Sequence, residues 1–305
     1  METNIVTNVV PNQTPVIPPD WASLGVVSGY NPPTPEKLRL LIDGPEGEGK
    51  STFVASMPNN LILDFEGGAG GIVGPKSKRV RITGFDHFMK IHEKLVADAK
   101  STTPYFKRVS YDGADRWSEM WARQCAKELS ERSKTDVMDI ADYGSHGAGY
   151  RVLKNRAWRN IQEIEEAGYG WAIIGHITDE TITDPTNPKK EITVPRLALI
   201  KSLRTPLCQS CDFHATIYSQ TTEATSTYKA LVDVGGGKFV ETDMPGKSVF
   251  TTIYKFNCVS VGGKTGKARG VPDMETRFEL PLIGGWDLFV QKYNQAVTKA
   301  KGKVS

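Results

Sequence analysis

The chain has 305 residues, of which 39% are hydrophobic and 24% are charged, a composition typical of a soluble globular protein. The chain has 38 Lys and Arg residues and 35 Asp and Glu residues, which gives a formal net charge of +3. The surface as a whole is therefore not basic enough to bind nucleic acid, and any such contact must be made by a local patch. No stretch approaches the ~20 consecutive apolar residues that a membrane-spanning helix needs, and we expect no membrane insertion.

Residues 1–36 differ from the rest of the chain because they are rich in Pro, Asn and Thr. The prolines disfavour regular helix and central strand, so we predict a flexible arm. Its apolar cluster would pack either on its own domain or on a neighbouring subunit, and consists of Trp21, Leu24, Val26 and Val27. The first basic residue is Lys37, which is unlike a secretory signal, and we expect a cytoplasmic location.

From residue 37 onward, short apolar runs alternate with amphipathic stretches. This alternation predicts an α/β fold with a mostly parallel sheet and helices on both faces. The predicted strands cover residues 38–43, 61–65, 79–82, 108–112 and 171–176. The predicted helices cover residues 50–56, 85–99, 114–132 and 150–167.

After about residue 210 the segments become richer in Thr, Val and aromatic residues, which is typical of antiparallel strands. We predict such strands at 213–218, 227–232, 249–256 and 277–280, followed by an amphipathic helix at 286–300. The sequence therefore divides into an arm over residues 1–36, a core over 37–220, and a small β-rich extension with a C-terminal helix over 221–305.

The strongest motif lies between the first predicted strand and helix. It fits the phosphate-binding loop pattern of Gly, four residues, Gly, Lys and Ser or Thr. The glycines let successive backbone N–H groups point at phosphate oxygens, assisted by the helix dipole. We expect the segment to bind ATP, with Lys50 at the β and γ phosphates and Ser51 on Mg²⁺. Its residues are Gly44, Pro45, Glu46, Gly47, Glu48, Gly49, Lys50, Ser51 and Thr52.

Three further strand ends carry polar side chains. Asp64 and Glu66 end the second predicted strand, and Glu66 is our candidate for orienting or deprotonating an attacking water; the alternative is that both acids only solvate the strand end. Asp112 ends a strand interrupted by polar residues and is a candidate Mg²⁺ ligand. His176 ends an apolar strand, where it either contacts the γ-phosphate or is simply packed.

The order of these motifs resembles that of the RecA-like nucleotide-binding proteins of phages, including the phage single-strand-annealing ATPases. The resemblance covers roughly residues 37–280 and implies a RecA-like P-loop NTPase core. It implies that Glu66 is the catalytic base, Asp112 the Walker B acid and His176 the sensor of the γ-phosphate. The segments that carry it are 44–52, 63–68, 111–112, 142–144 and 174–176.

The resemblance further implies single-stranded DNA as a partner, bound by loops that follow the core strands. Two segments suit this role, a glycine-rich loop with aromatics and the long polar segment 178–196. Aromatic rings can stack on bases while cations neutralise phosphates, although the basic residues after the glycine loop also fit a solvated helix face. The candidates are Tyr143, Tyr150, Arg151, Lys154, Lys189, Lys190 and Arg196.

RecA-like filaments complete their active sites with basic residues of a neighbouring subunit, so the resemblance implies a homo-oligomer, either a ring or a filament. Lys264, Lys267 and Arg269 lie in a glycine-rich turn and are the candidates for this role in trans.

The four cysteines are too few and too unevenly spaced for a disulfide framework, and we interpret them as reduced thiols. Cys208 and Cys211, with His214 nearby, have partial metal-ligand spacing, and the sequence does not decide whether they bind a metal.

The phosphate loop predicts a Mg-ATP-binding protein, and the resemblance implies a DNA-stimulated ATPase in phage-type recombination or annealing, with phage or host recombination and replication proteins as further partners. In that setting the location would be the host cytoplasm. Two other classes stay open: a nucleotide-gated binding protein with negligible turnover, and a small-molecule P-loop phosphotransferase. The sequence does not distinguish strand exchange, annealing and loading of another factor.

Overall fold

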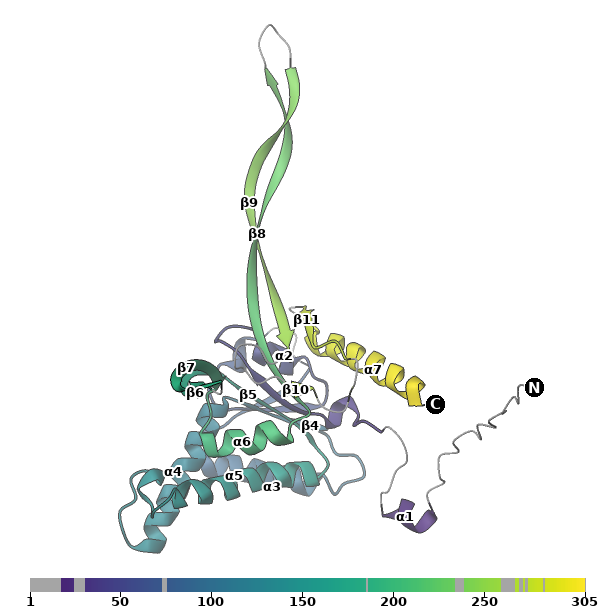
Figure 1. Ribbon diagram of the computed structural model, residues 1–305. Coiled ribbons are helices and arrows are strands. Elements are labelled where there is room, and N and C mark those ends of the chain that lie inside the picture. The colour runs from purple at the N-terminus through teal and green to yellow at the C-terminus, as the bar shows by residue number, and fades with distance from the viewer. Residues whose placement is uncertain are drawn as a thin grey trace, which may run out of the picture.

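A long β-hairpin rises from an α/β body in the computed structural model of the chain (Figure 1). The structure describes residues 18–24, 31–72, 76–184, 186–233, 239–258, 267–268, 271, 274–281 and 283–304. No helix among these residues is long and apolar enough to cross a membrane.

The body is built on a nine-stranded sheet with the order β11-β9-β8-β1-β5-β4-β2-β3, and β10 pairs with β8. Neighbouring strands from β8 through β1, β5, β4 and β2 to β3 run parallel, and β9, β10 and β11 add antiparallel pairs. The strands are β1 Arg39–Asp43, β2 Asn60–Asp64, β3 Lys78–Arg81, β4 Arg108–Asp112, β5 Gly170–Gly175, β8 Phe213–Asp233, β9 Phe239–Asn257, β10 Lys267–Ala268 and β11 Arg277–Leu280. The predicted α/β class with a β-rich C-terminal part is confirmed.

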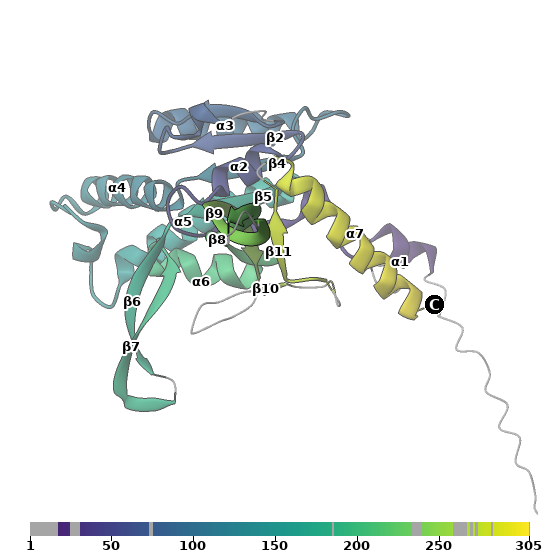
Figure 2. The same cartoon turned by 90° about the horizontal axis from the view of Figure 1, so that it is seen from above.

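Helices cover both faces of the sheet, as the view from above shows (Figure 2). Successive residues of β1 alternate between the two resulting cores, because Leu41 faces one and Leu40 and Ile42 face the other. The first core contains residues of α3 Phe85–Asp98, α4 Ala114–Ser133, α5 Ala148–Glu166 and α6 Lys201–Ser210. The second contains residues of α2 Lys50–Ala55 and α7 Gly285–Val304. Shorter helical turns are α1 Pro19–Ser23, η1 Pro35–Lys37, η2 Ala69–Gly71 and η3 Ile140–Asp142.

The polar strand β4 is wholly buried, despite the interruptions in its apolar pattern. The guanidinium of Arg108 donates to the carbonyl oxygens of Leu38 and Trp171 at 2.8 and 3.2 Å, and Ser110 donates to the Asn60 side chain at 2.9 Å. Burial lowers the pKa of Arg108 to about 9. Because these buried polar groups are hydrogen-bonded, the strand can lie inside the sheet, and Asp112 stands at its carboxyl end.

Two segments differ from the sequence-based prediction. Residues 178–196, predicted as a polar loop, form most of a separate hairpin of β6 Ile177–Asp184 and β7 Asn187–Leu197, in which Ile182 pairs with Ile192. Its alternating β-branched residues explain the extended pairing. The strands predicted at 213–218 and 227–232 are one continuous strand, β8, so the boundary expected after residue 220 falls inside a sheet strand.

The N-terminal arm is described only in part. Trp21 and Leu24 are 55% and 77% exposed, which contradicts the alternative that they pack on their own domain. Val26 and Val27 lie outside the described residues.

Candidate functional site

The phosphate-binding loop joins the end of β1 to the start of α2, as the motif predicted. Gly44 and Gly49 have φ values of 155° and 83°, and both need to lack a side chain. A Cβ on Gly44 would stand 2.0 Å from the carbonyl oxygen of Ile217 in β8. The loop is therefore fixed in place by close contact with the neighbouring strand.

Lys50 is buried at the start of α2 with its ammonium group turned back over the loop. Its Nζ donates to the carbonyl oxygen of Gly44 at 2.9 Å and also to that of Pro45. Burial lowers the pKa of this lysine, while nearby carboxylates, led by Asp112 and Glu66, oppose the shift. The position suits a cation that is to meet phosphate oxygens at the mouth of the loop.

Ser51 and Asp112 come from different elements and meet beside the loop. The Ser51 hydroxyl donates to Asp112 Oδ1 at 3.1 Å. Burial, together with the charges of Glu66 and Asp64, raises the pKa of Asp112 to about 6, although the hydrogen bond from Ser51 acts in the opposite direction. A hydroxyl and a carboxylate are ligands that Mg²⁺ accepts together with phosphates and water, and a cation would relieve this crowding of acids. The two side chains therefore fit the Mg²⁺ that ATP carries.

Glu66 and His176 face each other across the same opening. His176 Nε2 lies 3.2 Å from Glu66 Oε1 and 3.4 Å from Oε2, and both side chains are about one third exposed. Gly113, which follows Asp112, leaves space for Glu66, because a Cβ there would lie 2.7 Å from Glu66 Cγ. The arrangement brings an accessible carboxylate and an imidazole to the strand ends beside the loop.

All these groups surround one cavity of about 270 Å³. Its lining includes most of the predicted phosphate loop, the three predicted strand-end residues and one aromatic side chain that the sequence did not point to. The lining residues are Glu46, Gly47, Glu48, Gly49, Lys50, Ser51, Thr52, Glu66, Gly68, Asp112, Gly113, Ile174, Gly175, His176 and Tyr254.

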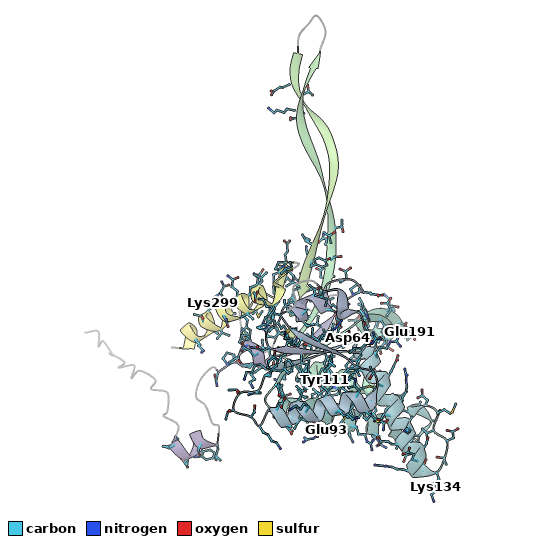
Figure 3. All side chains as sticks on the ribbon, turned by 180° about the vertical axis from the view of Figure 1, so that it is seen from behind. Asp64, Glu93, Tyr111, Lys134, Glu191 and Lys299 are labelled. Atoms are coloured by element: carbon cyan, nitrogen blue, oxygen red, sulfur yellow. The ribbon has the colours of Figure 1, made fainter. Side chains whose placement is uncertain are left out.

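Asp64 does a different task from Glu66, although the two are neighbours on the chain. Its carboxylate accepts from the backbone N–H of Gly67 and lies 3.7 Å from the guanidinium of Arg79. Figure 3 labels Asp64 within the body below the hairpin. This acid holds the turn after β2, and that turn presents Glu66 to the cavity.

The predicted DNA-contacting residues do not all share one environment. Tyr150 lines a groove of about 840 Å³ with Ile140, Arg123 and Lys201, whereas Tyr143 packs on a small apolar cluster formed by α4 and the segment just after it. Arg196 lines a separate cavity of about 330 Å³. The remaining candidates are exposed and make no side-chain hydrogen bond or ion pair with another described residue: Arg151, Lys154, Lys189 and Lys190.

The candidates for a role in trans lie largely outside what the structure describes, whereas the two cysteines of the possible metal site are described. Lys264 and Arg269 lie outside the described residues, and Lys267 is described only as part of the backbone of β10. Cys208 and Cys211 stand where α6 ends before β8. The described part of the chain contains no group of three or more His, Cys, Asp or Glu side chains that could hold a metal.

A buried ion pair that the sequence did not predict lies behind the loop. His214 Nε2 lies 2.8 Å from Asp43 Oδ2, and Thr216 donates to Asp43 Oδ1 at 2.6 Å. The pKa of His214 rises to about 9, because the hydrogen bonds and charges of Asp43 and Cys208 outweigh a desolvation that lowers it. The sequence offered one sign of this pair, since Asp43 is an acid at a strand end like Glu66 and Asp112. Nothing in the sequence indicated that His214 lies beside it.

The fold and this cavity define a P-loop nucleotide-binding domain. Residues 36–245, roughly two thirds of the chain, match the family model described as AAA domain, and the chain belongs to that family. Among curated proteins none matches the chain at a significant level.

Proposed function

We propose that the protein hydrolyses Mg-ATP in the cavity beside the phosphate loop and couples this turnover to single-stranded DNA. The observation that carries the proposal is the convergence of three separate elements on the loop. The Ser51–Asp112 hydrogen bond and the Glu66–His176 pair stand in the same cavity as Lys50. AAA-family membership supports nucleotide binding as the basis of the activity.

In the proposed reaction each group has a distinct task. Lys50 and the loop N–H groups hold the phosphates, and Ser51 and Asp112 hold Mg²⁺, which neutralises phosphate charge when bound. Glu66 accepts a proton from a water molecule as the water oxygen bonds to the γ-phosphorus and the bond to the β–γ bridging oxygen breaks, giving ADP and phosphate. His176 holds the Glu66 carboxylate and faces the position of the γ-phosphate.

The hydrolytic step is tested by ATP binding and turnover in two variants. Lys50→Ala should lose ATP binding, whereas Glu66→Gln should bind ATP and lose at least ~100-fold in turnover, because a carboxamide cannot take the proton. Lys90→Ala and Glu93→Gln are matched controls on the exposed face of α3, and Figure 3 shows Glu93 on the side away from the hairpin. Full turnover in Glu66→Gln would contradict the assignment.

The same variants distinguish the two other classes. A nucleotide-gated binding protein would bind ATP through Lys50 with negligible turnover even in the unaltered chain. A phosphotransferase would turn over only when a small-molecule acceptor is added, with phosphate recovered on that acceptor.

The coupling to single-stranded DNA is supported by the groove beside Tyr150. Its apolar side chains and exposed tyrosine suit stacked bases, and its lining also contains Lys201 and Arg123, the latter ion-paired with Glu119. Arg151 and Lys154 lie on the same helix as Tyr150, pair with no described residue, and could meet phosphates. Phage-type recombination or annealing, with phage or host recombination and replication proteins as partners, is the process that we propose for this activity.

We also propose that a neighbouring copy completes the site. Among the described residues that line the cavity, Lys50 is the only Lys or Arg, whereas phosphoryl transfer commonly uses a second cation. Lys264, Lys267 and Arg269 are the proposed donors in trans. If so, Lys50→Ala mixed with the triple alanine variant should recover part of the turnover that each lacks alone, and no recovery would contradict a shared site.

A further inference from the structure

The base of the long hairpin forms one wall of the nucleotide cavity. Tyr254 of β9 pairs across the sheet with Ser219 of β8 on one side and with Leu280 of β11 on the other. Its half-buried side chain lines the cavity together with the phosphate loop. A residue about 200 positions after the loop therefore stands directly against it.

Tyr254 meets the loop at close range. Its ring atoms Cδ1 and Cε1 lie 3.4 and 3.6 Å from the point where a Cβ would stand on Gly49. The preceding loop residue, Glu48, accepts a hydrogen bond from the backbone N–H of Ser219, the cross-strand partner of Tyr254. The hairpin base thus holds the loop by a hydrogen bond and places a flat aromatic ring beside it.

Tyr254 also borders a second, small hollow beside the loop. Its lining joins Glu48, Gly49 and Thr52 of the loop to apolar side chains, among them Phe53 and Leu280. Among the described residues that line the cavity beside the phosphate loop, Tyr254 is also the only Phe, Tyr or Trp. A nucleotide held by its phosphates at Lys50 has a polar end at the loop and a flat base that needs an apolar partner.

We propose that Tyr254 is the nucleobase-contacting residue of this site, with its ring packed on the base of the bound nucleotide. The inference rests on the proposed function and deepens it, because it assigns the part of the nucleotide that is not phosphate. It also makes the hairpin base part of the nucleotide site.

The test compares a ligand that has a base with one that has none. Binding of ATP and of inorganic tripolyphosphate, each with Mg²⁺, is measured by calorimetry for the full chain and for Tyr254→Ala, Tyr254→Leu and Tyr254→Phe. We expect Tyr254→Ala and Tyr254→Leu to weaken ATP binding roughly tenfold and to leave tripolyphosphate binding unchanged, because stacking contributes only when a base is bound. Tyr254→Phe should keep ATP affinity, because it keeps the ring.

Tyr218→Ala is the matched control. Tyr218 lies next to Ser219 on β8, so its side chain is on the opposite face of the same hairpin, and it does not line the cavity. It should leave both affinities unchanged. Tyr254→Leu retains an apolar side chain of substantial size, so it keeps the comparison valid if Tyr254→Ala disturbs the fold.

Three results would overturn the inference. ATP affinity that is unchanged in both Tyr254→Ala and Tyr254→Leu would show that the ring makes no contact with the base. Parallel loss of ATP and tripolyphosphate affinity would show that Tyr254 only supports the loop. If the unaltered chain bound no ATP, or bound it equally well as Lys50→Ala, the proposed function itself would fail and this inference with it.

Discussion

Acidic residues stand at or just beyond the ends of three strands of the sheet, β1, β2 and β4, and their surroundings differ. Asp112 is buried against Ser51, Glu66 reaches an accessible opening beside His176, and Asp43 is sealed behind the loop with His214. In the proposed mechanism, Asp112 holds the cation and Glu66 takes the proton, whereas Asp43 pairs with His214 inside the protein; burial and partners account for the difference. Two predictions follow from this division of tasks.

Gly113→Ala should impair turnover more than binding. Gly113 has a φ of 97°, and a Cβ there would lie 2.7 Å from Glu66 Cγ, so the carboxylate has to move. We expect ATP affinity within a few-fold of the unaltered chain and turnover lower by roughly 10- to 100-fold, measured by steady-state kinetics. Gly71→Ala, which meets open space, is the control, and equal turnover in the two variants would refute this account.

The Asp43–His214 pair should make stability depend on pH. The folded pKa of His214, about 9, lies above its ordinary value of 6.5, so the stabilisation is complete below pH 6.5 and is lost as pH rises through 9. We expect the free energy of unfolding in urea to fall by on the order of 3 kcal/mol over that range. In His214→Gln this decrease should be much smaller. An identical decrease in the variant would show that other groups cause it.

At the scale of elements, the C-terminal segments are parts of the core. β8 pairs with β1 beside the phosphate loop. The aromatic residues of α7 pack on α2, the helix that follows the loop. Phe289 of α7 lies 5.2 Å from the Phe213 ring and 6.2 Å from the Phe53 ring, between centroids. Elements more than 150 residues apart in sequence therefore hold the nucleotide site.

Phe289→Ala should strongly destabilise the whole molecule. The side chain is fully buried, and removal of such a ring costs about 3–5 kcal/mol of unfolding free energy. Chemical denaturation should show one cooperative transition at lower denaturant. Ile283→Ala, at a position that is 66% exposed, should change stability by less than about 0.5 kcal/mol. A cost below about 1 kcal/mol for Phe289→Ala would contradict a shared core.

The hairpin of β6 and β7 should contribute to DNA affinity through its exposed lysines. Lys189→Ala with Lys190→Ala removes two cations, which should lower affinity for single-stranded DNA and reduce the slope of log affinity against log salt by about 1.4. DNA-independent ATP turnover should not change. The double control Lys299→Ala with Lys301→Ala lies on α7, and Figure 3 shows Lys299 across the body from Glu191 of β7. Equal salt slopes in the two double variants would show that this hairpin does not contact the DNA.

For the whole molecule, local patterns predicted the fold class and the phosphate loop, because both depend on residues close in sequence. The strand before Gly44, the helix after Lys50 and the acidic strand ends could each be recognised within a short window. Tyr254, His214 and Phe289 could not, since their roles depend on strand order and on long-range pairing. The burial of the polar strand β4 could not be predicted either, because Arg108 donates to carbonyl groups that are far away in the sequence.

The most direct test of the central claim is ATP turnover by the full chain, titrated with single-stranded DNA at two salt concentrations beside Lys50→Ala. We predict turnover that rises with DNA, needs more DNA at the higher salt because phosphate contacts are screened, and is absent in the variant. Turnover that depends on Lys50 but is indifferent to DNA at both salt concentrations would contradict the coupling.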